Sequence, residues 1–134
     1  MSTIVTDRGF GPDDWTAPIV ALEDARPGVG INLAASADPM ELAGRLRDTP
    51  LIRVNFASFA DGRGFSIARR LRLMGYKGRL RAAGHVIADQ YAMARRAGFD
   101  EVEISDELAA RQPQDQWQFR ADWRAHDYQS RLRG

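Results

Sequence analysis

Cysteine is absent from the 134-residue chain, and histidine is scarce. Without cysteine there is no disulfide, no thiolate nucleophile, no cysteine-ligated iron–sulfur cluster and no cysteine zinc site. Only His85 and His126 offer an imidazole, so a site built from several histidines of one chain is not expected. The sequence therefore predicts no metal centre.

Long apolar runs are also missing. No stretch approaches the ~20 apolar residues that span a bilayer. The first residues, MSTIVTDRGFG, lack the basic start and apolar stretch of a signal peptide. We therefore expect a cytoplasmic protein that does not associate with a membrane.

Acidic residues are missing from one long segment, although the whole chain has a net charge of only +1. No Asp or Glu occurs from Gly62 to Ala88. The basic residues of that segment are Arg63, Arg69, Arg70, Arg72, Lys77, Arg79 and Arg81. Acids become frequent again after Phe99. Two interpretations stay open: solvated faces of opposite sign that partly neutralise each other, or a basic surface for an anionic ligand or an acidic protein.

Nucleic acid is not an expected partner of this basic segment. The run is short, and its aromatic residues Phe65 and Tyr76 have the positions of core or turn residues rather than of stacking platforms.

Strand and helix patterns alternate along most of the chain. Strands are predicted at residues 18–22, 29–34, 51–59, 79–84 and 100–105. Helices are predicted from Asp38–Pro39 onward, at 65–74, at 86–97 and directly after 105. Crossovers of this length favour parallel, right-handed βαβ units. We therefore predict an α/β fold with a mainly parallel sheet of about four or five strands.

The length fits a single domain with three parts. Residues 1–28 form a turn-rich N-terminal segment, 29–112 the α/β core and 113–134 a polar C-terminal extension. The aromatic residues Trp117, Phe119 and Trp123 of the extension are expected to cover a sheet face or a subunit contact.

The first candidate site is the turn Asp61-Gly62-Arg63-Gly64, between a predicted strand and a basic helix. Asp61 can cap the helix, the glycines can leave backbone N–H groups exposed, and Arg63 can direct its guanidinium toward an anion. A dinucleotide fingerprint is incomplete, because Ile67 stands at the third glycine position. The alternative is a capped turn with a solvent-facing arginine.

The second candidate site is Asp89-Gln90, near the start of helix 86–97 and expected at the same sheet edge. Gln90 lies on an apolar stripe, so its amide needs a partner, either loop backbone or a ligand. Asp89 is expected to pair with Arg63 or Arg81. His85 is either an acid–base group or a capping and surface residue.

The predicted ligand-binding set is therefore Asp61, Gly62, Arg63, Gly64, Arg81, Asp89 and Gln90. No catalytic residue is assigned, because Ser58 and Ser66 have no plausible base beside them in the sequence.

Five motifs occur in order between residues 29 and 105. They are Asp61-Gly62-Arg63, Ser66-Ile67-Ala68-Arg69, Gly78-Arg79-Leu80-Arg81-Ala82-Ala83-Gly84, Asp89-Gln90 and Arg96-Ala97-Gly98-Phe99-Asp100. Together they resemble the bacterial family known as domain of unknown function 934. Members commonly carry Asp after the glycine that ends the third motif, whereas this chain has His85, so that position receives no family role.

The resemblance implies a small protein encoded beside assimilatory sulfite reductase genes and often labelled an oxidoreductase of sulfite reduction. Two hypotheses follow. In the first, the chain is an accessory protein that binds an oxyanion or an acidic partner, such as sulfite reductase or another sulfur-assimilation protein, through its basic strand-to-helix edge. In the second, it is a small oxidoreductase that uses a noncovalently bound nucleotide cofactor. The cofactor, if one is used, stays unassigned.

Overall fold

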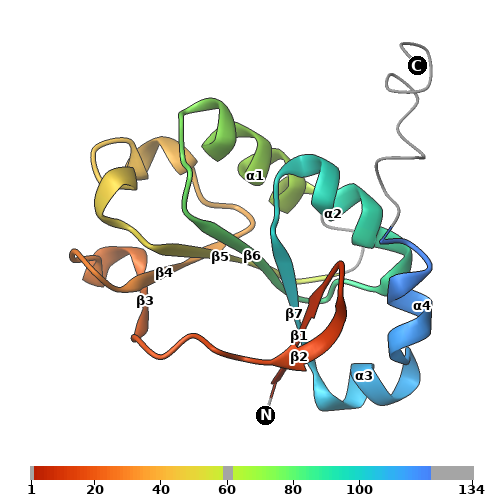
Figure 1. The fold of residues 1–134 in the computed structure, drawn as a ribbon. Coiled ribbons are helices and arrows are strands. Elements are labelled where there is room, and N and C mark those ends of the chain that lie inside the picture. The colour runs from red at the N-terminus through yellow and green to blue at the C-terminus, as the bar shows by residue number, and fades with distance from the viewer. Residues whose placement is uncertain (1, 59–61, 122–134) are drawn as a thin grey trace, which may run out of the picture.

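The computed structural model describes residues 2–58 and 62–121, which form one α/β domain around a seven-stranded sheet (Figure 1). The strand order is β2-β1-β7-β6-β5-β4-β3. The strands are β1 (Ser2–Thr6), β2 (Gly9–Pro12), β3 (Ile19–Ala21), β4 (Gly30–Ala34), β5 (Leu51–Phe56), β6 (Arg79–Gly84) and β7 (Glu101–Ser105). Strands β3 to β7 are parallel, whereas β1 and β2 are antiparallel to their neighbours. The predicted class and mainly parallel sheet are confirmed, but the strand number is larger than predicted.

The helices connect and flank these strands. They are α1 (Arg63–Leu73), α2 (Tyr91–Ala97), α3 (Asp106–Arg111), α4 (Gln114–Gln118) and the 3-10 helices η1 (Leu22–Asp24), η2 (Pro39–Leu42), η3 (Leu46–Asp48) and η4 (Ala88–Gln90). At Asp38 the predicted cap is present, since its carboxylate accepts a hydrogen bond from the backbone N–H of Met40. The continuous helix expected after it is replaced by η2 and η3, with Gly44 between them.

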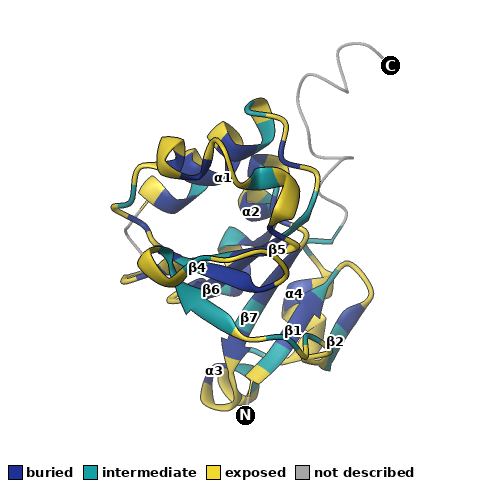
Figure 2. Cartoon of the chain, turned by 90° about the vertical axis from the view of Figure 1, so that its left-hand side faces the viewer, coloured by how far each residue is buried: buried dark blue, intermediate teal, exposed yellow. Residues whose placement is uncertain are grey.

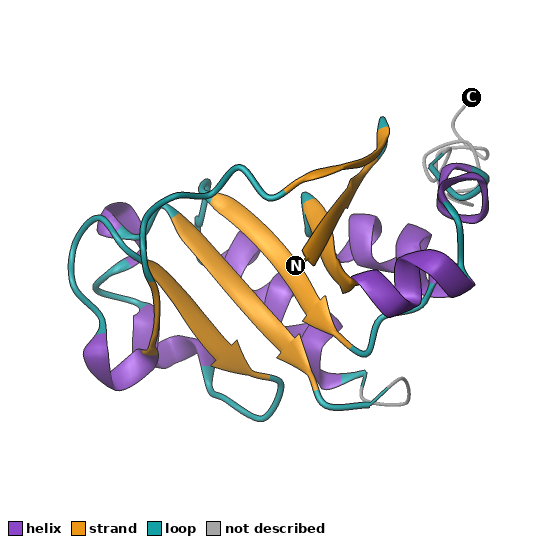
Figure 3. Ribbon diagram, turned by 90° about the horizontal axis from the view of Figure 1, so that it is seen from below, coloured by secondary structure: helices purple, strands orange, loops and turns teal. Residues whose placement is uncertain are grey.

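The parallel strands are wound in one direction. Strands β3 to β7 are neighbours in chain order, so each crossover moves the chain one step the same way across the sheet. Right-handed crossovers in one direction place all their helices on one face. Figure 3 shows this arrangement, with the strands in front and α1 and α2 behind them. The other face carries no crossover helix among the described residues, and the segment from β2 to β3 runs across it (Figures 1 and 3).

The hydrophobic core lies between the sheet and α1 and α2. In β6, Leu80 and Ala82 are fully buried on the helix side, as the alternation of a strand requires. In α1, the side chains of Ile67, Ala68 and Leu71 are buried at helical spacing. The opposite sides of α1 and α2, which face away from the sheet, are exposed (Figure 2).

The N-terminal hairpin was not predicted. Strand β1 pairs with β7, and β2 pairs with β1, so the segment expected to be turn-rich contributes two strands to the sheet edge. Ile4 and Val5 of β1 are buried. The turn of this hairpin ends at Gly9, whose φ of 111° lies in the region that favours glycine. Because β1 has only five residues and two of its buried residues are adjacent, its sequence lacks the alternation of apolar and polar residues that predicts a strand.

The C-terminal extension begins with an ordered helix. α4 packs against β2, where the backbone N–H of Phe10 donates to the side chain of Gln114 at 2.8 Å. Trp117 is buried against the ring of Tyr91, whereas Phe119 is exposed. Trp123 lies outside the described residues. Within the described ranges, no helix has the length and apolar character needed to cross a membrane.

Candidate functional site

The start of α1 and the end of β6 meet at Phe56, the last residue of β5. Gly64, in the first turn of α1, lies against the Phe56 ring so closely that a Cβ there would overlap it. Gly84 ends β6 with φ 89°, and a Cβ there would come within 2.5 Å of the Phe56 carbonyl oxygen. His85 donates its backbone N–H to the same oxygen at 3.0 Å. Gly64, at the start of α1, and Gly84, at the end of β6, therefore lie at the same edge of the sheet, as expected.

Arg63 is exposed at the start of α1. The N-cap residue before it is Gly62, so no side chain caps the helix at this position. Asp61, the predicted cap, lies outside the described residues.

The Asp89-Gln90 pair makes local contacts. The side-chain oxygen of Gln90 accepts a hydrogen bond from the backbone N–H of Ile87 at 3.1 Å, in the loop before its own helix. Asp89 is exposed, and its carboxylate pairs with Arg120 at 2.5 Å. Arg81 is not its partner, because the guanidinium of Arg81 is held by other carboxylates.

Arg81 is the main correction to the predicted site. Its side chain is 0% exposed and lies in the middle of β6, on the sheet face opposite α1 and α2. Its Nε donates to Glu101 at 2.6 Å and its Nη1 to Glu103 at 2.7 Å. Asp13 accepts two further bonds, at 3.0 and 3.1 Å. The guanidinium of Arg81 thus donates its hydrogen bonds to carboxylates of the same chain, and it is not available to an anion from solvent.

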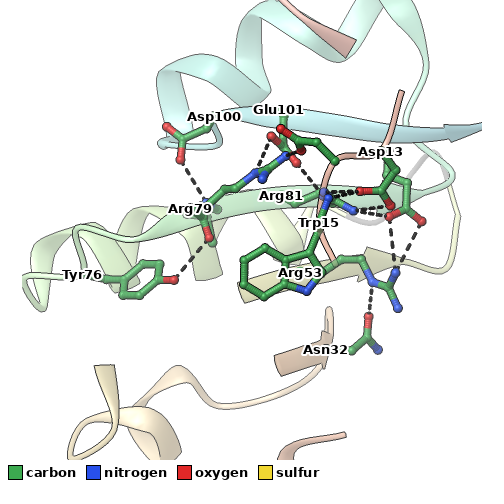
Figure 4. Close-up of polar contacts among 12 residues, drawn as sticks. Asp13, Trp15, Asn32, Arg53, Tyr76, Arg79, Arg81, Asp100 and Glu101 are labelled. Atoms are coloured by element: carbon green, nitrogen blue, oxygen red, sulfur yellow. Dashed lines mark hydrogen bonds and ion pairs between the residues drawn. The ribbon is translucent and has the colours of Figure 1, made fainter. Parts of the chain in front are cut away.

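Arg81 is the centre of a network that crosses the sheet face opposite α1 and α2 (Figure 4). Arg79 bonds to Glu101 at 2.8 Å and pairs with Asp14. Arg53 donates to Asn32 at 2.9 Å and to Glu103 at 3.3 Å. The members are Asp13, Asp14, Asn32, Arg53, Arg79, Arg81, Glu101 and Glu103, and we call them the ion network. Since Asp13 and Asp14 belong to the segment between β2 and β3, the network fastens that segment to the sheet.

The charges of the network stabilise one another. Burial works against the ionisation of Asp13, but hydrogen bonds from Arg81 and from the backbone of Trp15, with the charges of Arg81 and Arg79, lower its pKa. Burial also works against the charge of Arg81, yet its hydrogen bonds and charge interactions with Asp13, Glu101 and Glu103 raise its pKa further above the ordinary value. Both groups are therefore charged at neutral pH.

A groove of about 430 Å³ opens beside this network, at the carboxyl ends of β5, β6 and β7. Its polar lining includes Arg53, Asn55, His85, Glu103, Ser105 and Arg111. Of these residues the sequence reasoning singled out only His85. A signal was present in β5, where Arg53 and Asn55 alternate with buried residues in an otherwise apolar strand.

Comparison with known proteins identifies the family of the chain. The chain belongs to the family described as bacterial protein of unknown function (DUF934). The family model matches residues 30–134 and confirms the resemblance carried by the motifs. No curated protein and no solved structure shows significant similarity to the chain.

Several residues of the DUF934 motifs have structural roles in this fold. Asp100 accepts a hydrogen bond from the backbone N–H of Leu80 at 2.9 Å and pairs with Arg72 at 3.0 Å. Arg72 also donates to the carbonyl oxygen of Gly98, which ends α2 with φ 119°. These contacts join α1, α2 and the start of β6. The resemblance therefore rests partly on residues that build the fold.

Proposed function

We propose that this protein is an accessory protein of assimilatory sulfite reduction that binds an acidic partner protein through the exposed face of α1. The partner that the family resemblance implies is sulfite reductase or a protein associated with it. The observation that carries the proposal is the charge of α1, which contains four arginines and no acidic residue.

The outer face of α1 has the composition of a protein-binding surface. Arg63, Arg69 and Arg70 are exposed, while Ile67 and its buried neighbours hold the helix to the sheet. Leu73, at the end of the helix, is 81% exposed. Arginines beside an exposed apolar side chain favour an acidic protein surface, because arginine is enriched in interfaces and steers association with opposite charge.

A protein partner is favoured over a small oxyanion at this edge. The oxyanion hypothesis depended on Arg81 acting together with Arg63, and Arg81 is buried between Asp13, Glu101 and Glu103. The arginines of α1 that remain exposed are spread along the helix, which suits an extended acidic surface better than a single small anion.

Charge reversal tests the proposal. The double variant Arg63→Glu, Arg69→Glu is expected to lose co-purification with sulfite reductase, or to bind it at least tenfold more weakly, since like charges across an interface repel. The matched control is Arg26→Glu, Arg47→Glu, which changes the net charge equally at two exposed positions outside α1. Equal binding by the wild type and the α1 variant overturns the proposal, and so does equal weakening by both double variants.

A further inference from the structure

We propose that the groove at the carboxyl ends of β5, β6 and β7 binds a small molecule that carries a carboxylate or another oxyanion group, held between Arg53 and Arg111. This site is separate from the outer face of α1. It lies on the sheet face opposite α1 and α2, where Figure 3 shows that no crossover helix covers the strands.

The position of the groove suits ligand binding. In open α/β sheets, ligands bind outside the carboxyl ends of the strands, where the chain connections leave a crevice. Here Asn55, Gly84 and Ser105 line the groove from the ends of three adjacent parallel strands. Its volume of about 430 Å³ falls in the range of sites that hold small metabolites.

Arg53 is oriented before any ligand arrives. Its Nε donates to Asn32 at 2.9 Å, and its Nη1 contacts Glu103 at 3.3 and 3.4 Å. Its Nη2 makes no hydrogen bond to the part of the chain that the structure describes. With 26% of the side chain exposed, the guanidinium keeps donors available while its orientation is fixed, and such preorganisation lowers the cost of binding an oxyanion.

Arg111 supplies a second cation from another element. It is the last residue of α3, is exposed, and has no ion-pair partner among residues 2–58 and 62–121. The side chain of Asn55 adds a hydrogen-bonding group at the end of β5, and His85 lines the groove directly after β6. Two guanidiniums that line one groove match the several oxygen atoms of a carboxylate, sulfate or phosphate group.

The carboxylates of the groove limit which ligands fit. Glu103 lies between Arg81 and Arg53, so its charge is already shared by two guanidiniums. Glu107 is exposed in the first turn of α3 and also lines the groove. A second anionic group near Glu107 would be repelled. The expected ligand therefore has one oxyanion group and an opposite end that is neutral or positively charged.

An NMR titration of the uniformly 15N-labelled full chain tests the site with sodium sulfate and sodium acetate as probes. Sodium chloride at equal ionic strength controls for screening. We expect saturable shifts of the backbone amides of residues 83–85 and 103–105 with at least one probe. Sulfate alone would identify a tetrahedral oxyanion site, and acetate alone a carboxylate site.

Two variants assign the binding to the arginines. Arg111→Ala changes only an exposed side chain and is expected to weaken the probe at least fivefold. Arg53→Lys keeps the charge but removes the planar fork, and we expect a similar loss. The control Arg47→Ala should bind as the wild type does.

The inference is overturned by shifts that do not saturate, by shifts elsewhere on the chain only, or by unchanged binding in Arg111→Ala. The α1 charge-reversal variant should keep this site, which separates the two proposals.

Discussion

The carboxylate of Asp13 holds the guanidinium of Arg81 at two points, although the two residues are 68 positions apart in the chain. The two bonds measure 3.0 and 3.1 Å. Arg81 is fully buried, whereas the side chain of Asp13 is 33% exposed. The pair therefore joins the segment between β2 and β3 to the middle of the sheet, from the face that no crossover helix covers.

Replacing Arg81 should destabilise the fold strongly. In Arg81→Met, Glu101 and Glu103 lose their shortest cationic contacts while staying buried or partly buried. Removing one partner of a buried ion pair costs about 3–5 kcal/mol in the free energy of unfolding. Urea denaturation measures this loss, with Arg69→Met as the exposed control, for which a change below about 0.5 kcal/mol is expected. A loss below about 1 kcal/mol for Arg81→Met would contradict a stabilising role for the ion network.

The contribution of Asp13 should depend on pH. Its pKa in the folded protein lies below the ordinary value, so the stabilisation is complete above an unfolded-state pKa of about 4. It is lost as the pH falls through the lower, folded-state pKa. We therefore expect Asp13→Asn to be less stable than the wild type at pH 7, and the difference in free energy of unfolding to shrink below about pH 4. Urea midpoints measured at several pH values check this, and a difference that does not change with pH would count against it.

Two glycines at the start of α1 should respond differently to alanine. A Cβ at Gly64 would overlap the Phe56 ring, whereas a Cβ at Gly62 would meet no atom within 4 Å. Since overpacking costs about 1–3 kcal/mol, Gly64→Ala should lower the free energy of unfolding by that amount. Gly62→Ala should change it by less than about 0.5 kcal/mol. Thermal unfolding of the two variants provides the comparison, and equal melting temperatures would show that the ring moves aside without cost.

The sequence predicted the central strands and helices well, because their signals are local. Strand β6 was predicted at residues 79–84 and has those bounds, since apolar and basic residues alternate along it. The helix predicted at 65–74 is α1, and the helix predicted at 86–97 contains η4 and α2, which ends at Gly98. By contrast, β1 forms its ladder with β7, and no local pattern predicts a pairing between residues so far apart.

The candidate site was harder to predict because it depends on neighbours in space. Arg81 was interpreted from its place near a strand end in a basic segment, but its partners come from β7 and from the N-terminal segment. Those contacts depend on the strand order, which could not be predicted from the sequence pattern. The alternation of Arg53 and Asn55 with buried residues in β5 is a local signal that the second face of the sheet is polar.

The pairing of β1 with β7 limits when the sheet can be completed during synthesis at the ribosome. Residues 2–5 are made before their partners, residues 102–105, which follow about a hundred residues later. Until β7 emerges, the N-terminal hairpin has no sheet to join, and its open strand edge can pair with other chains. The ladder between β1 and β7 can therefore form only after β7 has been synthesised.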